Sequence, residues 1–320
     1  MSLVWHSIKL PPNEIYLDKL LRCGQAFRWV KNDNIWSSTL NNRVVFLRQI
    51  EDQLEYASLT SLKENSPKVK KLQPKLEEEI QDDVLGLISD YLNLQISIVQ
   101  LYKDWASKDA HFAKVSAAFA GIRMLQQDPW ETLISFICSS NNNVKRISKM
   151  CHALCLEYGD FIVEYAGTKY YTFPTPDQLA SRASEASLRE LGFGYRARYV
   201  YETSKMLADD KALFMQLHSM RSSNFTDEQV HEFLLQFKGV GPKVADCVAL
   251  MSLNRHSLVP IDTHVLQFAR RDYSYKFRGR SNATLSSAMY VDMKRFFVEK
   301  WGGYAGWAHS VLFTRDLKLE

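Results

Sequence analysis

The sequence predicts an α+β protein in which an antiparallel β-sheet near the N-terminus is followed by a mainly helical body. Short β-rich runs separated by polar turns fill residues 1–60, which is the pattern of a β-meander. From about residue 84 to residue 313, helical periodicity dominates instead. With 46% hydrophobic and 12% aromatic residues, the 320-residue chain can form substantial cores. We expect an N-terminal domain over 1–127, which holds the sheet and the helices after it, and a helical domain over 128–320.

The sheet is expected to contain four strands joined by short turns. Each run is rich in β-branched and aromatic residues, and each gap contains Asn or Asp. The dipeptide Gly24-Gln25, just before the first strand, indicates either a bulge or a place where something must approach the backbone. The expected strands are 27–30, 35–40, 44–47 and 54–56.

A charged segment with two prolines, residues 61–83, follows the sheet. We interpret it as a solvated connector that leads into a helix over 77–92. The alternative is a nuclear-localisation patch, formed by Lys68, Lys70, Lys71 and Lys75.

Composition excludes several classes of protein. No run of 18 apolar residues occurs, so no transmembrane helix is expected. The first residues lack a basic segment followed by an apolar one, so no secretory signal is expected, while mitochondrial import stays open. Five cysteines suggest reduced intracellular thiols, with Cys151 and Cys155 on one buried helix face. The histidines show no zinc spacing. A net charge of +4 requires any DNA footprint to be local, and we expect a monomer.

The segment after residue 127 combines a buried helix with a polar tip. Asp128-Pro129 is an N-cap followed by a first-turn proline, and Trp130–Cys138 carries an apolar face. The tip is Ser-Ser-Asn-Asn-Asn, followed by Lys145 and Arg146. The asparagines could simply cap the helix. Placed beside two cations, they would equally suit contacts with phosphates and base edges.

A second tip lies at residues 192–199, Gly-Phe-Gly-Tyr-Arg-Ala-Arg-Tyr. Tyr195 on a glycine-hinged loop could wedge into a base stack, with Arg196 reaching an opposite base. The alternative is a core tyrosine with surface arginines. The basic segment 272–285 is left unassigned.

The most informative stretch begins at Thr226 and predicts a helix-hairpin-helix over 227–252. Thr226 and Gln229 fit a capping box, and Gly239-Val240-Gly241 suits a hairpin that needs positive φ. Pro242 starts the next helix. The unpaired N–H groups at this helix start could bind a phosphate. From the glycines alone, an ordinary corner between two helices is an equal alternative.

Three side chains near this hairpin indicate chemistry. Lys243 follows the hairpin directly, Cys247 lies one helical turn further on, and Asp262 follows in Val-Pro-Ile-Asp-Thr-His. A lysine beside a carboxylate in a partly dry pocket is how an amine nucleophile is built. A surface ion pair is the alternative for any Lys–Asp pair.

Together these motifs resemble the helix-hairpin-helix (HhH-GPD) DNA glycosylase superfamily, through GVGPKVADC and VPIDTH. More narrowly, the chain resembles the eukaryotic 8-oxoguanine DNA glycosylase/AP lyases along nearly its whole length. No four-cysteine cluster follows Asp262, which argues against the iron–sulfur branch. The further matching segments are GQAFRW (24–29), FICSSNNN (136–143), LGFGYRARY (191–199) and WGGYAGWAHSVLF (301–313).

The resemblance implies that Lys243 attacks C1′ of a flipped nucleotide and forms a Schiff base, assisted by Asp262. It implies that the damaged base meets Gly24, Cys247, Pro260, Asp262 and Phe313, and that His264 and the hairpin glycines Gly239 and Gly241 contact phosphates. For His264, a core histidine is the alternative. Tyr195 would wedge into the stack, Asn141 would fill the gap, and Arg146 and Arg196 would hold the orphaned cytosine. No cofactor is required, although the carbonyls of Leu235, Phe237 and Val240 could hold a structural monovalent or calcium ion.

The chain departs from the family at two positions. Lys238 stands where the family has proline, which adds a phosphate contact or loosens the hairpin. His309 stands where the family has a glutamine that reads the base edge. Since an imidazole has its donor and acceptor on opposite sides, we expect weaker discrimination or a broader range of oxidised purines, including formamidopyrimidine.

The resemblance therefore implies a bifunctional enzyme that excises 8-oxoguanine opposite cytosine from double-stranded DNA and nicks the strand. We expect it in the nucleus, with the mitochondrion as a second possibility, and not at a membrane. The alternatives are a glycosylase for other damaged bases and a non-catalytic DNA-binding module.

Overall fold

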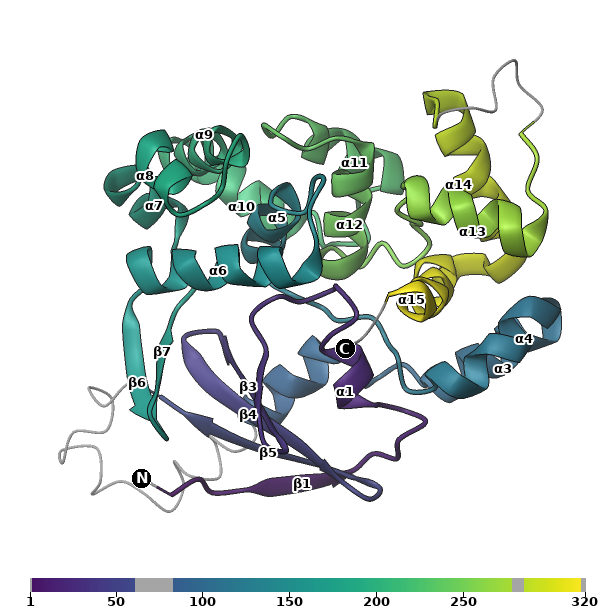
Figure 1. Ribbon diagram of the computed structural model, residues 1–320, viewed down its shortest axis with the longest axis horizontal. Helices are drawn as coiled ribbons and strands as arrows, with labels where there is room; N and C mark the ends of the chain where they lie inside the picture. The colour runs from purple at the N-terminus through teal and green to yellow at the C-terminus, as the bar shows by residue number, and fades with distance from the viewer. Residues whose placement is uncertain (1, 61–82, 278–284, 318–320) are drawn as a thin grey trace.

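The computed structural model describes residues 2–60, 83–277 and 285–317. It has the predicted α+β class: an antiparallel sheet formed by the first sixty residues lies beneath a helical body (Figure 1). The lysine-rich patch and residues 278–284 of the basic segment 272–285 lie outside the described residues. Among the described helices, none has both the length and the apolar character that crossing a bilayer requires.

The sheet has five antiparallel strands in the order β1-β5-β4-β3-β2. Strands β2 to β5 follow one another as a meander, as predicted. The turn between β3 and β4 places Asn41 and Asn42 at φ 44° and 62°. Positive φ at both turn residues matches the twist of a two-residue hairpin. Sequence reasoning missed the edge strand β1. The strands are β1 (His6–Lys9), β2 (Val30–Asn32), β3 (Ile35–Leu40), β4 (Arg43–Ile50) and β5 (Gln53–Leu59).

Both faces of this sheet are covered. Val45 and Leu47 pack with α1 (Leu17–Leu20) and with a helix over 83–91. Val44 and Phe46, on the opposite face, pack against a hairpin formed by β6 (Phe161–Tyr165) and β7 (Thr168–Tyr171). The uninterrupted apolar run 44–47 is therefore the sign of a strand buried on both sides.

Two predictions about the chain path need correction. The expected strand 27–30 is not a strand except at Val30, because its residues serve two cores: Phe27 packs in the helical body and Trp29 under the sheet. The body is also not wholly helical, because the β6–β7 hairpin leaves it to reach the sheet (Figure 1). The hydroxyl of Tyr170 on β7 donates to Ser37 Oγ on β3 at 3.0 Å and holds the β6–β7 hairpin against the sheet.

The helical body has one large core, and its predicted caps are present. Asp128 caps α5 by accepting from the N–H of Glu131, and Thr226 and Gln229 form the expected capping box of α11. The remaining helices are α3 (Ile98–Lys108), α4 (Ala110–Ser116), α5 (Pro129–Ile137), α6 (Val144–Tyr158), α7 (Pro176–Arg182), α8 (Glu185–Glu190), α9 (Arg196–Asp209), α10 (Lys211–Ser219), α11 (Asp227–Leu235), α12 (Pro242–Ser252), α13 (Thr263–Tyr273), α14 (Ser287–Trp301) and α15 (Ala305–Asp316), with short 3₁₀ turns η2 (Ala117–Phe119) and η3 (Gly302–Tyr304).

Candidate active site

The predicted helix-hairpin-helix is formed by α11 and α12. Gly239 has φ +79°, a conformation that glycine adopts without strain, and Gly241 is the N-cap of α12 with Pro242 at its first position. The hairpin rests on α9, because a Cβ added at Gly239 would lie 2.7 Å from the ring of Tyr199. The start of α12 thus presents N–H groups without a side-chain cap.

Lys243 lies in the first turn of α12 and is half-buried. Its Nζ is 5.7 Å from the ring centre of Phe136, which is buried on the neighbouring helix α5. The Lys243 side chain therefore lies beside an apolar aromatic ring.

Asp262 is the N-cap of α13. Its Oδ1 accepts from the N–H groups of His264 and Val265 at 2.9 and 3.0 Å, which fixes the direction of the carboxylate. The His264 side chain is 70% exposed, so the alternative of a core histidine is excluded.

Cys247 and His309 are buried groups whose pKa values respond to both the Lys243 amine and the Asp262 carboxylate. Burial raises the pKa of the Cys247 thiol to about 11, an effect that Lys243 opposes and Asp262 reinforces. Burial lowers the pKa of His309 to about 4, while Asp262 acts to raise it and Lys243 to lower it. Lys243 and Asp262 therefore both act electrostatically on the same two buried groups, and the expected meeting of the four side chains at one catalytic centre stays a prediction.

The other predicted base-binding residues come from three segments. Phe313 lies one turn after His309 on α15, with ring centres 5.8 Å apart, and Pro260 is buried beside Asp262. Gly24 has φ +82°, and a Cβ there would lie 3.5 Å from Val144 and 3.9 Å from Leu317, just after α15. The backbone at Gly24 thus lies beside the end of the helix that carries Phe313.

The two predicted polar tips form one unit. Tyr195 is 46% exposed and donates its hydroxyl to the carbonyl of Ser140 at 3.0 Å. Asn141 is exposed with φ +48°, a left-handed conformation that asparagine adopts more readily than most residues. The exposed Arg146 donates to the carbonyl of Gly192 at 3.1 Å. Because the Tyr195 side chain is exposed, the alternative that Tyr195 is a core residue is excluded.

Arg196 differs from the expectation. It is only 2% exposed, and its guanidinium donates to the main-chain carbonyls of Ser140 and Asn141, the latter at 2.9 Å. In this arrangement Arg196 holds the Asn141 tip in shape rather than facing a base. The other two asparagines of the tip have local structural roles. Asn142 donates to the carbonyl of Cys138, and Asn143 caps α6.

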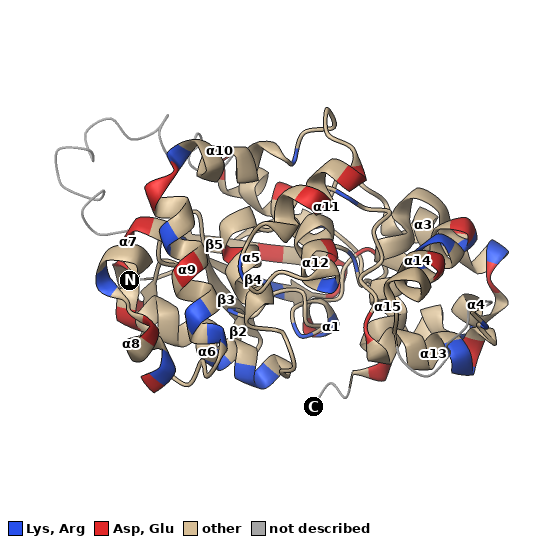
Figure 2. Ribbon diagram, turned by 90° about the horizontal axis from the view of Figure 1, so that it is seen from above, with Lys and Arg blue, Asp and Glu red and all other residues tan. Residues whose placement is uncertain are grey.

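Helix α6 carries its cations at the wrong end for helix stability. Lys145, Arg146 and Lys149 are exposed near its N-terminus, where the helix dipole disfavours positive charge (Figure 2). No acidic residue occupies the first turn. This placement favours a role in binding an external anion.

The hairpin carbonyls were expected to be able to hold a cation. The carbonyl of Phe237 already accepts from the N–H of Val240 at 3.2 Å, which leaves one lone pair. Three neutral main-chain oxygens, from Leu235, Phe237 and Val240, are a donor set that hard cations accept. The described residues contain no cluster of three His, Cys, Asp or Glu side chains that could hold a metal.

Sequence reasoning missed a buried charge next to the site. Asp246, one residue before Cys247, is completely buried and accepts from His231, Tyr290 and Lys294. An acidic residue inside an apolar helix was the available signal. Its partners on α11 and α14 could not be read from the sequence.

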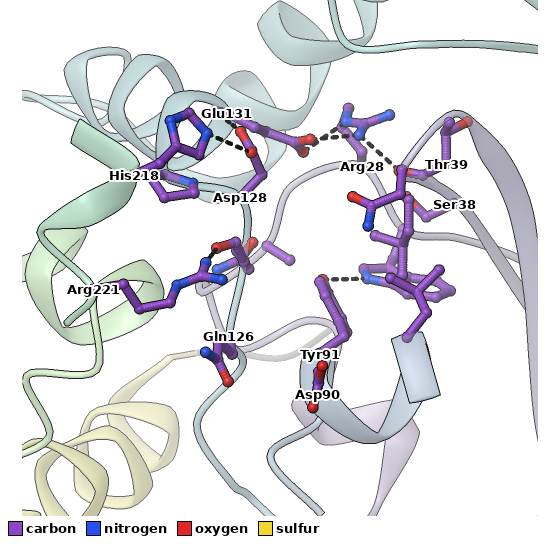
Figure 3. Close-up of a pocket in the computed structure, with 17 residues that line it drawn as sticks. Arg28, Ser38, Thr39, Asp90, Tyr91, Gln126, Asp128, Glu131, His218 and Arg221 are labelled. Carbon is purple, nitrogen blue, oxygen red and sulfur yellow. Dashed lines mark hydrogen bonds and ion pairs between the residues drawn. The ribbon is translucent and has the colours of Figure 1, made fainter. Parts of the chain in front are cut away.

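A cavity of about 210 Å³ lies elsewhere, between the sheet and the start of α5 (Figure 3). Its polar groups already pair with one another: Arg28 donates to Glu131, and Asp128 lies 3.3 Å from His218. None of the residues predicted for the active site lines it. The start of α12 around Lys243, not this cavity, is therefore the candidate active site.

Two family models together match residues 7–287 of the chain. Residues 7–133 match the family model described as 8-oxoguanine DNA glycosylase, N-terminal domain, and residues 134–287 match the HhH-GPD superfamily base excision DNA repair protein. Fold and site thus define a DNA glycosylase of the helix-hairpin-helix class.

Three similar proteins indicate which group of these glycosylases the chain belongs to. The N-glycosylase/DNA lyase of Saccharomyces cerevisiae is 38% identical, with 99% of this chain and 87% of that protein covered. OGG1 of Arabidopsis thaliana, also named N-glycosylase/DNA lyase, is 37% identical, with 99% and 81% covered. The solved 8-oxoguanine glycosylase/lyase of Clostridium acetobutylicum is 28% identical, with a TM-score of 0.78 and 98% of each chain covered. The chain belongs to the N-glycosylase/DNA lyase family of 8-oxoguanine DNA glycosylases.

Proposed function

We propose that this protein excises 8-oxoguanine opposite cytosine from double-stranded DNA and then nicks the strand at the resulting site. The observation that carries the proposal is the placement of Lys243 in the first turn of α12, directly after the glycine hairpin, with Asp262 held as the N-cap of α13. A nucleophilic amine and a carboxylate in one pocket are what a glycosylase with lyase activity needs. The names of the full-length relatives support the same reaction.

The target base must first leave the duplex, which costs a few kcal/mol. Tyr195, exposed on the tip, wedges into the stack, and Asn141 enters the vacated space. Arg146 and the α6 cations hold the backbone and the orphaned cytosine. Arg196 assists by keeping the Asn141 tip in place through its bonds to Ser140 and Asn141.

The chemistry then proceeds at C1′. The Lys243 nitrogen forms a bond to C1′ and loses a proton, while the bond from C1′ to the base breaks and the base leaves with the electron pair and a proton. The C1′–O4′ bond then breaks, O4′ takes up a proton and the sugar ring opens, which converts the C1′–N single bond into a protonated imine. This imine acts as an electron sink, so removal of a C2′ proton expels the 3′ phosphate. Asp262, held by the start of α13, stabilises the positive charge that develops on the sugar.

The pocket recognises oxidised purines through main-chain and stacking contacts. The carbonyl of Gly24 accepts from N7–H, a donor that guanine gains on oxidation at C8. Phe313 and Cys247 flank the ring, and Pro260 contributes its carbonyl. We include formamidopyrimidine, the ring-opened product, because it keeps the same pairing edge.

Around the pocket, DNA phosphates are held by main-chain N–H groups of the hairpin at Gly239 and Gly241 and by the exposed His264. A monovalent or calcium ion on the carbonyls of Leu235, Phe237 and Val240 would stiffen the hairpin. Because its substrate is damaged DNA, we propose that the protein acts in the nucleus, with the mitochondrion as a second location, and as a monomer.

The decisive experiment is borohydride trapping on a duplex that contains one 8-oxoguanine opposite cytosine. We expect a covalent protein–DNA complex that disappears in Lys243→Gln, while Asp262→Asn slows its formation. DNA binding without a trapped complex would support a non-catalytic hairpin module. Trapping only on duplexes with alkylated bases would support a glycosylase of another substrate class.

A further inference from the structure

The buried hydroxyl of Tyr290 contacts the helix that carries Lys243. Tyr290 lies on α14 and is only 8% exposed, and its hydroxyl donates to Oδ2 of the completely buried Asp246 on α12. Asp246 follows Lys243 by three residues, so the two side chains leave α12 from neighbouring positions of one helical turn. A carboxylate close to the amine along the helix is therefore tied to a residue of a different helix.

The same hydroxyl lies near the main chain that leads into Asp262. Burial and the charge of Asp246 raise the pKa of Tyr290, whereas a hydrogen bond from the Ile261 main chain acts to lower it. The Ile261 N–H therefore approaches the phenolic oxygen, because a hydrogen bond that lowers the pKa of a phenol must come from a donor. Ile261 is 1% exposed and directly precedes Asp262, the N-cap of α13. Ile261 and Tyr290 also belong to the same apolar core as Cys247 on α12.

We propose that Tyr290 is a positioning residue for the reaction at Lys243. Through Asp246 on one side and Ile261 on the other, its hydroxyl fixes the Asp262 carboxylate relative to the helix that carries the amine. The inference rests on the function proposed above and adds to it a residue that touches neither the base nor the sugar. Such positioning has a large effect on rate, because a displacement of about 1 Å at the reacting groups can cost about a hundredfold.

The test measures the single-turnover excision rate and the dissociation constant on a duplex with one 8-oxoguanine opposite cytosine. Tyr290→Phe removes only the hydroxyl, so we expect excision to slow by about tenfold or more while the dissociation constant is unchanged. Tyr275→Phe is the matched control and should keep the wild-type rate, because the buried Tyr275 hydroxyl donates to Asp292, on the same helix as Tyr290. A Tyr290→Phe rate within about threefold of the wild type would overturn the proposal. If the wild type itself excises nothing, the function proposed earlier fails instead.

Two further variants separate positioning from simple stabilisation of the fold. Lys294→Gln removes another partner of Asp246 but keeps the Tyr290 hydroxyl, so it should lower the melting temperature and keep the excision rate at a temperature where the protein stays folded. Equal rate losses in Lys294→Gln and Tyr290→Phe would contradict the proposal, because the rate would then follow stability. In an Asp262→Asn background, Tyr290→Phe should slow excision by less than about threefold, since two residues that act through one group are not additive. Full additivity of the two substitutions would likewise contradict the proposal.

Discussion

Asp246 Oδ2 lies 2.9 Å from Lys294 Nζ, in a position where the aspartate is completely buried and the lysine side chain is 21% exposed. The same carboxylate accepts from Tyr290 and lies 2.9 Å from His231 Nδ1. Asp246 therefore joins α12, which carries Lys243 and Cys247, to α11 and to α14. The reactive helix is anchored on its buried side by charge rather than by apolar packing alone.

Asp246→Asn should destabilise the protein markedly. Removing one partner of a buried ion pair leaves the other charge uncompensated, at a cost of about 3 kcal/mol. Chemical denaturation measures the effect. Asp177→Asn is the matched control, because Asp177 pairs with Lys211 at the surface, where both side chains are more than 60% exposed. The control should lose less than about 1 kcal/mol. Equal losses would show that Asp246 is not a structural anchor.

The hairpin glycines should respond differently to the same substitution. Gly239→Ala places a methyl group 2.7 Å from the ring of Tyr199 at a positive φ, so we expect a loss of about 1–3 kcal/mol. Gly241 has φ −101° and open space around it. Gly241→Ala should change stability by less than about 0.5 kcal/mol.

DNA binding separates the two glycine variants further. If phosphate approaches the start of α12, the Gly241→Ala methyl group should weaken duplex binding without affecting the melting temperature. Fluorescence anisotropy with a fixed salt concentration measures this. Unchanged affinity in Gly241→Ala would place the phosphate elsewhere.

Acid should destabilise the protein partly through His256. Burial lowers the pKa of this histidine to about 4 from its ordinary 6.5. Between these values the unfolded chain binds more protons, so stability is lost as the pH falls from 6.5 towards 4. His256 Nδ1 accepts from Trp307 Nε1 at 3.0 Å.

His256→Asn keeps an acceptor for Trp307 but removes the titration. The wild type should therefore lose about 2 kcal/mol more than this variant between pH 7 and pH 5. Urea denaturation at both pH values measures the difference. Parallel losses in the two proteins would mean that His256 titrates normally in the folded state.

Arg146 should contribute to DNA binding electrostatically. If it neutralises a phosphate, Arg146→Gln should reduce the slope of log affinity against log salt by about 1. Lys108→Gln is the control, because Lys108 is 50% exposed and pairs with Asp104 on α3, far along the chain from the tips. A slope that changes equally in both variants would argue against a specific phosphate contact at Arg146.

The sequence by itself determined the parts that depend on local order. The Asn41-Asn42 turn, the Asp128 and Thr226 caps and the glycine hairpin all follow from short-range backbone preferences, and the structure contains each of them. Lys243, Cys247 and Asp262 could be singled out because they follow one another within a short stretch of the chain, on α12 and at the start of α13.

Only the tertiary structure decided where long-range partners lie. The burial of Arg196 against Ser140, the anchoring of Asp246 by Lys294 and the burial of the His309 imidazole each depend on elements that are distant in the chain. Local preferences do not encode which side chains will face a buried charge. The physical reason is that desolvation and pairing are set by the packing of whole helices, which exists only once the chain is folded.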